Sequence, residues 1–280
     1  MDISFQSLLL FIITTIIYFV FPSIGKPQLT LDYLSTDQSK INFYNKHMIS
    51  LAFYLGAVVV TQLFLNIGYL MTKCGGSLDK NIGAAAIFTF IPWVLIFGIL
   101  LLVLMIFPGF KSAFSDVIGY FVVAERANDI FGSILIGTDL NEMIEKSENI
   151  DKKRELTQAA EAIVKICGNK SILINQINTD NFLNIWDILT PLMRPDLIQE
   201  NKDIFKQNLL ELVVLKDNIG EAFWYVYTAI LISSIVYYNL ASRGCVKSVD
   251  QLKSDHKAYV QTQEEANKQK EINNSTIYTV

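Results

Sequence analysis

The sequence predicts an all-α membrane protein with about four transmembrane helices and a helical, water-facing module inserted between the third and the fourth. Of its 280 residues, 51% are apolar and only 18% are charged, and the mean hydropathy of +0.35 is high for a soluble domain. Four stretches of 17 residues or more carry no charge, which is close to the ~17 to 25 residues that cross a bilayer as a helix. Most of the remaining charge lies between the third and the fourth stretch.

The first predicted span covers residues 5–21 and ends at Pro22. A secretory signal has a basic start and small residues before its cleavage point, whereas this segment follows Asp2 and ends in Phe-Val-Phe-Pro. We therefore expect the segment, with residues 1–21 as its unit, to stay attached. The next unit, residues 22–48, has mixed charges and is predicted to be a polar connecting loop with at most a short surface helix.

Residues 49–107 are predicted to contain the second and third spans. The second covers residues 49–71 and is closed by Lys73 and two glycines. The third covers residues 84–107, the longest apolar run, which ends at Pro108 and a glycine. Pro92 removes a backbone hydrogen bond near the start of this run, so we expect a bend there.

Residues 111–221 form the predicted extramembrane module, which is acidic and mainly helical, with 12 Lys and Arg against 18 Asp and Glu. Its first part, residues 112–137, is apolar but interrupted by charges, which favours an interfacial or packed helix pair; a fifth crossing is the alternative. Further predictions within the module are helices at 151–166, 179–189 and 196–220 and a short strand at 172–177.

The last predicted helix of the module meets no helix breaker before Gly220, so we expect it to run into the fourth span, residues 222–241. Aromatic residues at both ends of this span are typical of membrane–water interfaces. The predicted interface aromatics are Trp93, Trp224, Tyr225, Tyr237 and Tyr238. Residues 242–280 are predicted to be a charged tail that is partly helical or disordered. Lys and Arg are similar in number on the two predicted sides, so the sequence leaves the orientation open.

The sequence offers little for catalysis. There are two histidines, outside any catalytic motif, and no phosphate-binding loop, nucleophile elbow or zinc helix. The three cysteines are an odd number and far apart, so we expect neither a disulfide framework nor a zinc site. We predict no catalytic, cofactor-binding or metal-binding residues. The net charge of −4 also disfavours direct binding to nucleic acid.

Gln62 and Asn66 are the polar pair of interest within the predicted spans. Their spacing of four residues places them on one face of the second helix. They could bond to another helix, which we favour, or line a pore. Ser233 and Thr15 are among the candidate partners in other spans.

Two motifs resemble a set of multi-span membrane proteins of nucleocytoplasmic large DNA viruses. One, FPGFKSAFSDVIGY, covers residues 107–120, and the other, NKSILINQI, covers residues 169–177 and is followed by Asn181 and Phe182. The residues of the first motif that carry the resemblance are Pro108, Gly109, Phe110, Ser112, Phe114, Ser115, Gly119 and Tyr120. The resemblance implies a structural protein of the virion inner membrane, or a link between membrane and capsid shell of the minor capsid type, and carries over no catalytic residue.

The resulting expectation is a non-enzymatic viral membrane protein, present in the virion inner membrane and in host-cell membranes during assembly. Its expected partners are the lipid bilayer, other virion or capsid proteins and further copies of itself. An ion channel or passive permease lined by Gln62 and Asn66 is the alternative. A third hypothesis is a membrane-bound enzyme that uses Glu125, Arg126 and Asp129.

Overall fold

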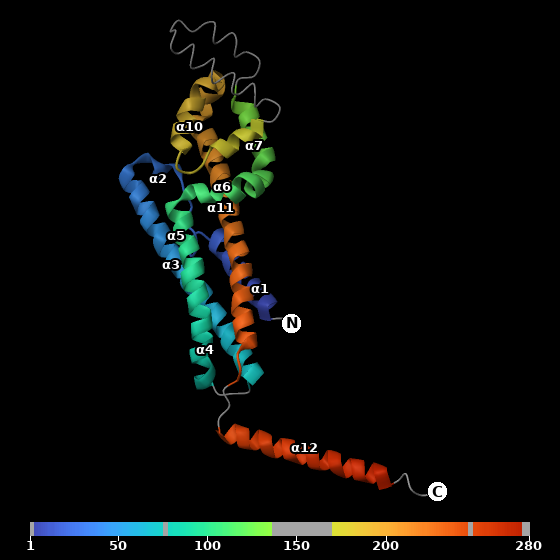
Figure 1. Cartoon of the computed structure of the whole chain (residues 1–280). Coiled ribbons are helices and arrows are strands. Elements are labelled where there is room, and N and C mark those ends of the chain that lie inside the picture. The colour runs from blue at the N-terminus through green and yellow to red at the C-terminus, as the bar shows by residue number, and fades with distance from the viewer. Residues whose placement is uncertain (1–2, 75–77, 136–169, 246–248, 276–280) are drawn as a thin grey trace.

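The computed structural model describes residues 3–74, 78–135, 170–245 and 249–275, and Figure 1 shows their arrangement. Within these ranges the regular secondary structure is helical, apart from an isolated bridge between Leu135 and Met193. The helices in chain order are α1 (Ile3–Val20), α2 (Leu31–Ser35), α3 (Asp37–Cys74), α4 (Leu78–Phe90), η1 (Ile91–Phe97), α5 (Gly98–Ile106), η2 (Pro108–Lys111), α6 (Ser112–Phe114), η3 (Ser115–Gly119), α7 (Tyr120–Ile134), η4 (Lys170–Gln176), α10 (Phe182–Leu189), η5 (Thr190–Leu192), α11 (Pro195–Ser242) and α12 (Val249–Ser275).

Three helical segments of the described chain are long and apolar enough to cross a membrane: Asp37–Cys74, Ile82–Ile106 and Asn201–Ser242. The helix α1 is shorter and equally apolar, and it packs against α3 and α11. These elements form an elongated bundle (Figure 1). Many large apolar side chains are exposed on its helices. The fold is thus all-helical and compatible with a membrane protein.

The helix α3 begins at Asp37, twelve residues before the predicted second span. Our prediction of a loop over residues 22–48 is therefore wrong for residues 37–48, nearly half of the segment, which are helical. No proline or glycine interrupts the chain between Asp37 and Gly56, so nothing in the local sequence ends a helix that the apolar stretch has already stabilised.

The third apolar segment contains a π-helix, η1, between α4 and α5. Pro92 lies at the start of η1, where its missing N–H removes one bond of the helical ladder. Trp93 and Phe97 are fully buried here against Phe11 of α1. Trp93 was predicted as a membrane-interface aromatic, and the structure corrects this, because the ring lies in the interior of the bundle.

The helix α11 spans 48 residues and joins the two halves of the molecule (Figure 1). Its only non-helical backbone is at Asn201, so the segment from there to Ser242 is one uninterrupted helix. The predicted continuation of the last module helix into the fourth apolar stretch is confirmed.

Two separate hydrophobic cores lie along α11. The first includes Phe131 of α7, Trp186 of α10 and Leu209 of α11, and we call the region around it the head. The second, in the bundle, includes Phe11, Trp93 and Tyr225. Residues from the first connection also belong to the head core, namely Leu29, Leu34 and Phe43. The head is therefore built from two distant parts of the chain and not from residues 111–221 alone.

Several predictions for the module can be compared with the structure. The apolar segment after residue 112 forms α6, η3 and α7, and α7 packs into the head core through Val123 and Phe131. The predicted strand at 172–177 is wrong, because the chain forms the 3₁₀ helix η4 there, with Ile174 buried beside α7. The predicted helix at 151–166 lies outside the described residues.

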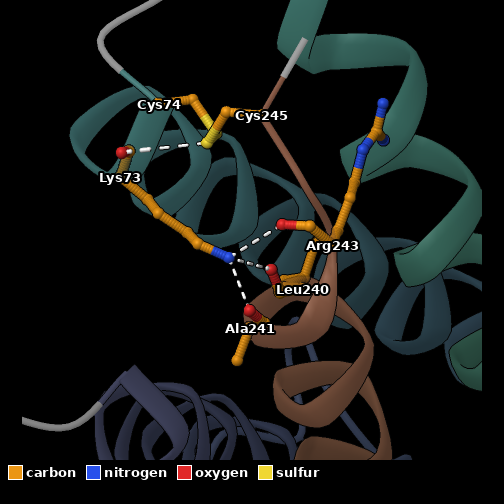
Figure 2. The surroundings of a disulfide bond; sticks show 6 residues. All are labelled: Lys73, Cys74, Leu240, Ala241, Arg243 and Cys245. Carbon is orange, nitrogen blue, oxygen red and sulfur yellow. Dashed lines mark hydrogen bonds between the residues drawn. A yellow bond between two sulfur atoms is a disulfide. The ribbon is translucent and has the colours of Figure 1, made fainter.

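The end of the bundle opposite the head carries a disulfide between Cys74 and Cys245, with an S–S distance of 2.02 Å (Figure 2). Lys73 beside it donates to three backbone carbonyl oxygens at the end of α11, those of Leu240, Ala241 and Arg243. Our expectation that the cysteines form no disulfide is wrong, since α3 and α11 end next to each other although 171 residues separate the two thiols.

The tail forms the helix α12, which projects from this end of the bundle (Figure 1). Its described side chains are exposed along its whole length, including Leu252 and Tyr259. The tail was predicted to be partly helical or disordered, and over residues 249–275 the structure has a continuous helix.

Candidate functional site at the joint between bundle and head

A cluster of three charged side chains lies where the bundle meets the head, and we call it the joint ion cluster. Glu221 of α11 is 2% exposed, and its Oε2 lies 2.8 Å from Lys26 Nζ and 2.6 Å from Lys111 Nζ. Lys26 follows α1 and Lys111 ends η2, so the cluster joins three segments far apart in the sequence. A buried carboxylate is tolerated when it is paired and hydrogen-bonded in this way.

The second carboxylate oxygen of Glu221 is also bonded. Tyr225 lies one turn further along α11 and donates its hydroxyl to Oε1 at 2.6 Å. Burial lowers the pKa of Lys26, against the opposing effect of Glu221. Burial acts in the same direction on Lys111, but its closer pairing with Glu221 outweighs this and raises the pKa. Glu221 therefore favours the charged form of Lys111.

A second ion pair, between a buried lysine and a partly exposed aspartate, lies just before this cluster on α11. Lys216 is 1% exposed, and its Nζ donates to Asp116 Oδ1 at 2.8 Å and to the carbonyl oxygen of Ile174 at 3.0 Å. Asn175 Nδ2 in turn donates to the carbonyl oxygen of Asp116. Asp116 belongs to the first sequence motif, and Ile174 and Asn175 belong to the second. The two motifs thus pack against each other around one lysine of α11.

Two glycines allow this close packing. A Cβ atom on Gly119 would lie 2.5 Å from the carbonyl oxygen of Lys216, and one on Gly220 would lie 2.6 Å from the backbone nitrogen of Ser115. Separations this short do not occur between real side chains and backbone. The small residues of the motif therefore let η3 cross α11 at backbone contact.

The other motif residues surround this crossing. Trp224 Nε1 donates to the carbonyl oxygen of Phe110 at 2.8 Å, and Phe114 packs edge-on against the Trp224 ring. The hydroxyls of Tyr120 and Ser171 lie 2.8 Å apart. Pro108 and Gly109 form the η2 turn, in which Ser112 Oγ donates to the carbonyl oxygen of Gly109.

Gln62 and Asn66 lie on α3, and their side chains are buried inside the bundle. Gln62 accepts from Ser7 Oγ and donates to the carbonyl oxygen of Ser7, while Ser7 also contacts Ser233. Asn66 Nδ2 donates to Thr89 Oγ1 at 2.8 Å. Both side chains therefore connect α3 to neighbouring helices.

The predicted interface aromatics of α11 divide by burial. Tyr225 is buried against Glu221, whereas Tyr238 is 72% exposed at the opposite end. Trp224 and Tyr237 are partly exposed, and Tyr237 packs beside Tyr69 of α3. Glu125, Arg126 and Asp129 are all exposed on α7. The structure thus does not bring these three side chains into the joint.

Sequence reasoning missed the joint ion cluster, although one signal pointed to it. In a chain that crosses four times, the end of the first span, the end of the third and the start of the fourth lie on one side. Lys26, Lys111 and Glu221 flank these three ends, so the predicted four-span topology would place them at one level.

No family model matches the chain, and no curated protein or solved structure is detectably similar to it.

Proposed function

We propose that the protein is a structural, non-enzymatic membrane protein that crosses the bilayer four times and presents its head to a protein partner. α1 would be the additional crossing beside the three longer helices. The resemblance of the two motifs to viral multi-span proteins supports a place in a virion inner membrane, with a capsid protein, another virion protein or a second copy of the chain as the partner.

The observation that carries this proposal is the uninterrupted helix from Asn201 to Ser242. Because this helix contributes to both hydrophobic cores, the head cannot turn freely relative to the bundle. The joint ion cluster adds a further attachment between α11, the segment that follows α1 and the end of η2. Such rigidity suits a protein that holds a partner at a fixed height above a membrane.

Photo-crosslinking tests the proposal. A photoreactive amino acid would be placed at Ile188 and at Ile204, two exposed apolar residues of the head. We expect crosslinks to protein in the assembled membrane or particle. Matched probes at Phe53 and Phe64, exposed on α3 of the bundle, should react with lipid. Head probes that capture only lipid or solvent would refute the role as a protein contact.

The channel remains the second candidate, and the hydrogen bonds of Gln62 and Asn66 favour a packing role over it. Ion flux through reconstituted protein that Gln62→Leu abolishes would reverse this preference.

A further inference from the structure

A cavity of about 240 Å³ lies beside the joint ion cluster. Its wall combines the N-terminal half of α3, the segment after α1, the end of α5 and the middle of α11. Lys26 and Lys111 line it, whereas Glu221 does not, so these two lysines belong both to the ion cluster and to the cavity wall. The cavity is therefore bounded by the same segments that fix the head to the bundle.

The position of the cavity suits a ligand from the membrane. In the proposed crossing, His47 lies two residues before the second span, Met105 and Pro108 mark the end of the third, and Asp217 lies five residues before the fourth. These ends define the level of the membrane–water interface, where phospholipid headgroups lie.

His47 is the first sign of a ligand. Its side chain lines the cavity and is 6% exposed, and its Nε2 has no hydrogen-bond partner among the described residues. Buried polar atoms are almost always bonded, so an unpaired one requires an explanation. A polar ligand atom in the cavity would supply the partner.

The charges of the wall indicate what kind of ligand fits. Three lysines (Lys26, Lys40 and Lys111) and two carboxylates (Asp180 and Asp217) line the cavity. Asp217 is 7% exposed and accepts from the backbone N–H of Thr179; burial raises its pKa, and the nearby lysines, Lys216 first, act in the opposite direction. Aromatic rings of Tyr33 and Phe43 also face the cavity, and such rings attract cations. Mixed charge of this kind favours a zwitterion over a simple anion.

We propose that this cavity binds a phosphoammonium zwitterion, as found in the headgroup of phosphatidylethanolamine. The ammonium group would lie towards Asp217 and Asp180, and the phosphate towards Lys40 and Lys111 with His47. Met105 and Pro108 lie where acyl chains could leave along the apolar surface of α5. The choice of a lipid as the source rests on the proposed membrane crossing, while the zwitterion chemistry rests on the cavity alone.

Binding to the full-length, delipidated protein in detergent tests the proposal, with native mass spectrometry as the readout. The probes are phosphatidylethanolamine, phosphatidylglycerol and soluble phosphoethanolamine. We expect phosphatidylethanolamine to bind at least about tenfold more tightly than phosphatidylglycerol, because only the former supplies a cation. Soluble phosphoethanolamine that binds as well as the lipid would support the site with a free metabolite as its ligand. Equal binding of both lipids, or binding of no probe, would overturn the proposal.

Substitutions localise the binding. Lys40→Met removes a partly exposed lysine of the cavity rim and should leave the fold intact, yet weaken binding about tenfold. Lys46→Met, on the same helix but outside the cavity wall, is the matched control and should bind normally. His47→Leu should also weaken binding. Thermal unfolding of this variant in detergent shows whether it is folded. Unchanged binding by Lys40→Met and His47→Leu would overturn the assignment. A wrong membrane assignment would appear separately, as protein that stays dissolved without detergent.

Discussion

The two ends of the apolar bundle are held together by different chemistry. At the head end, Lys26 and Lys111 contact one buried carboxylate, that of Glu221. At the opposite end, Cys74 is bonded covalently to Cys245, and the neighbouring Lys73 is exposed. Both ends fasten α11 to another part of the bundle.

The difference follows from the surroundings. Ion pairs in contact with water contribute little to stability, because solvent screens them. In a buried pair the two charges attract each other strongly, and this attraction has to offset the cost of removing both charges from water. A disulfide does not depend on burial in this way. The joint ion cluster is thus found where the head covers it. The disulfide is found where α3 and α11 end at the exposed end of the bundle.

The largest effect should come from Glu221→Gln. This variant leaves two buried lysines without their carboxylate, so we expect a loss of about 3–5 kcal/mol in the free energy of unfolding. Thermal or denaturant unfolding in detergent measures it. Glu211→Gln removes an exposed carboxylate from the same helix and should change stability by no more than about 0.5 kcal/mol. If the two variants lose the same amount of stability, the joint ion cluster contributes no more to stability than an exposed carboxylate does.

At the other end, Cys74→Ser should cost about 2–4 kcal/mol, since the cross-link no longer restricts the unfolded chain. The wild-type protein unfolded in the presence of a reductant should behave as the variant does. If reductant leaves the unfolding of the wild type unchanged, the bond contributes nothing to stability at this end.

A third comparison concerns backbone contact at the head end. Gly220→Ala places a methyl group against the backbone of Ser115, and such overpacking costs about 1–3 kcal/mol. Gly56→Ala on α3 has open space around the new methyl group and should be neutral or slightly stabilising. Unfolding measured side by side separates the two. A neutral Gly220→Ala would mean that η3 and α11 can move apart without loss.

The smallest effect is expected in the middle of the bundle. Gln62→Leu removes hydrogen bonds to α1, and bonds of this kind between membrane helices contribute about 0.6 kcal/mol on average. Thr61→Val removes a hydroxyl that bonds only within α3 and serves as the control. If Gln62→Leu loses much more stability than that average, Gln62 contributes to the free energy of unfolding on the scale of the joint ion cluster.

The sequence was informative where a single stretch of chain determines the outcome. Uncharged length located the apolar segments, and the lack of a helix breaker before Gly220 predicted the continuous α11. It was not informative where distant residues meet. Glu221 and Lys26 are 195 residues apart, and each looks like an ordinary charge at a span end until the helices are placed side by side.

The same limit applies to Cys74 and Cys245, because spacing alone could not pair them. For Trp93, residue type suggested a membrane interface, yet the large ring fills the space between α1 and η1. At the tail the polar composition left helix and disorder open, and the structure has the helix α12, which contains no proline or glycine.

The disulfide bears on which compartment each end of the molecule faces. Disulfides form and persist in oxidising surroundings, such as the lumen of the secretory pathway or the cell exterior. If the chain crosses the bilayer as proposed, the tail helix shares the oxidising side with Cys245, and the head faces the reducing side. The acceptor sequence Asn274-Ser275-Thr276 near the end of α12 should then carry N-linked glycan in eukaryotic cells, which a glycosidase would remove with a measurable drop in mass.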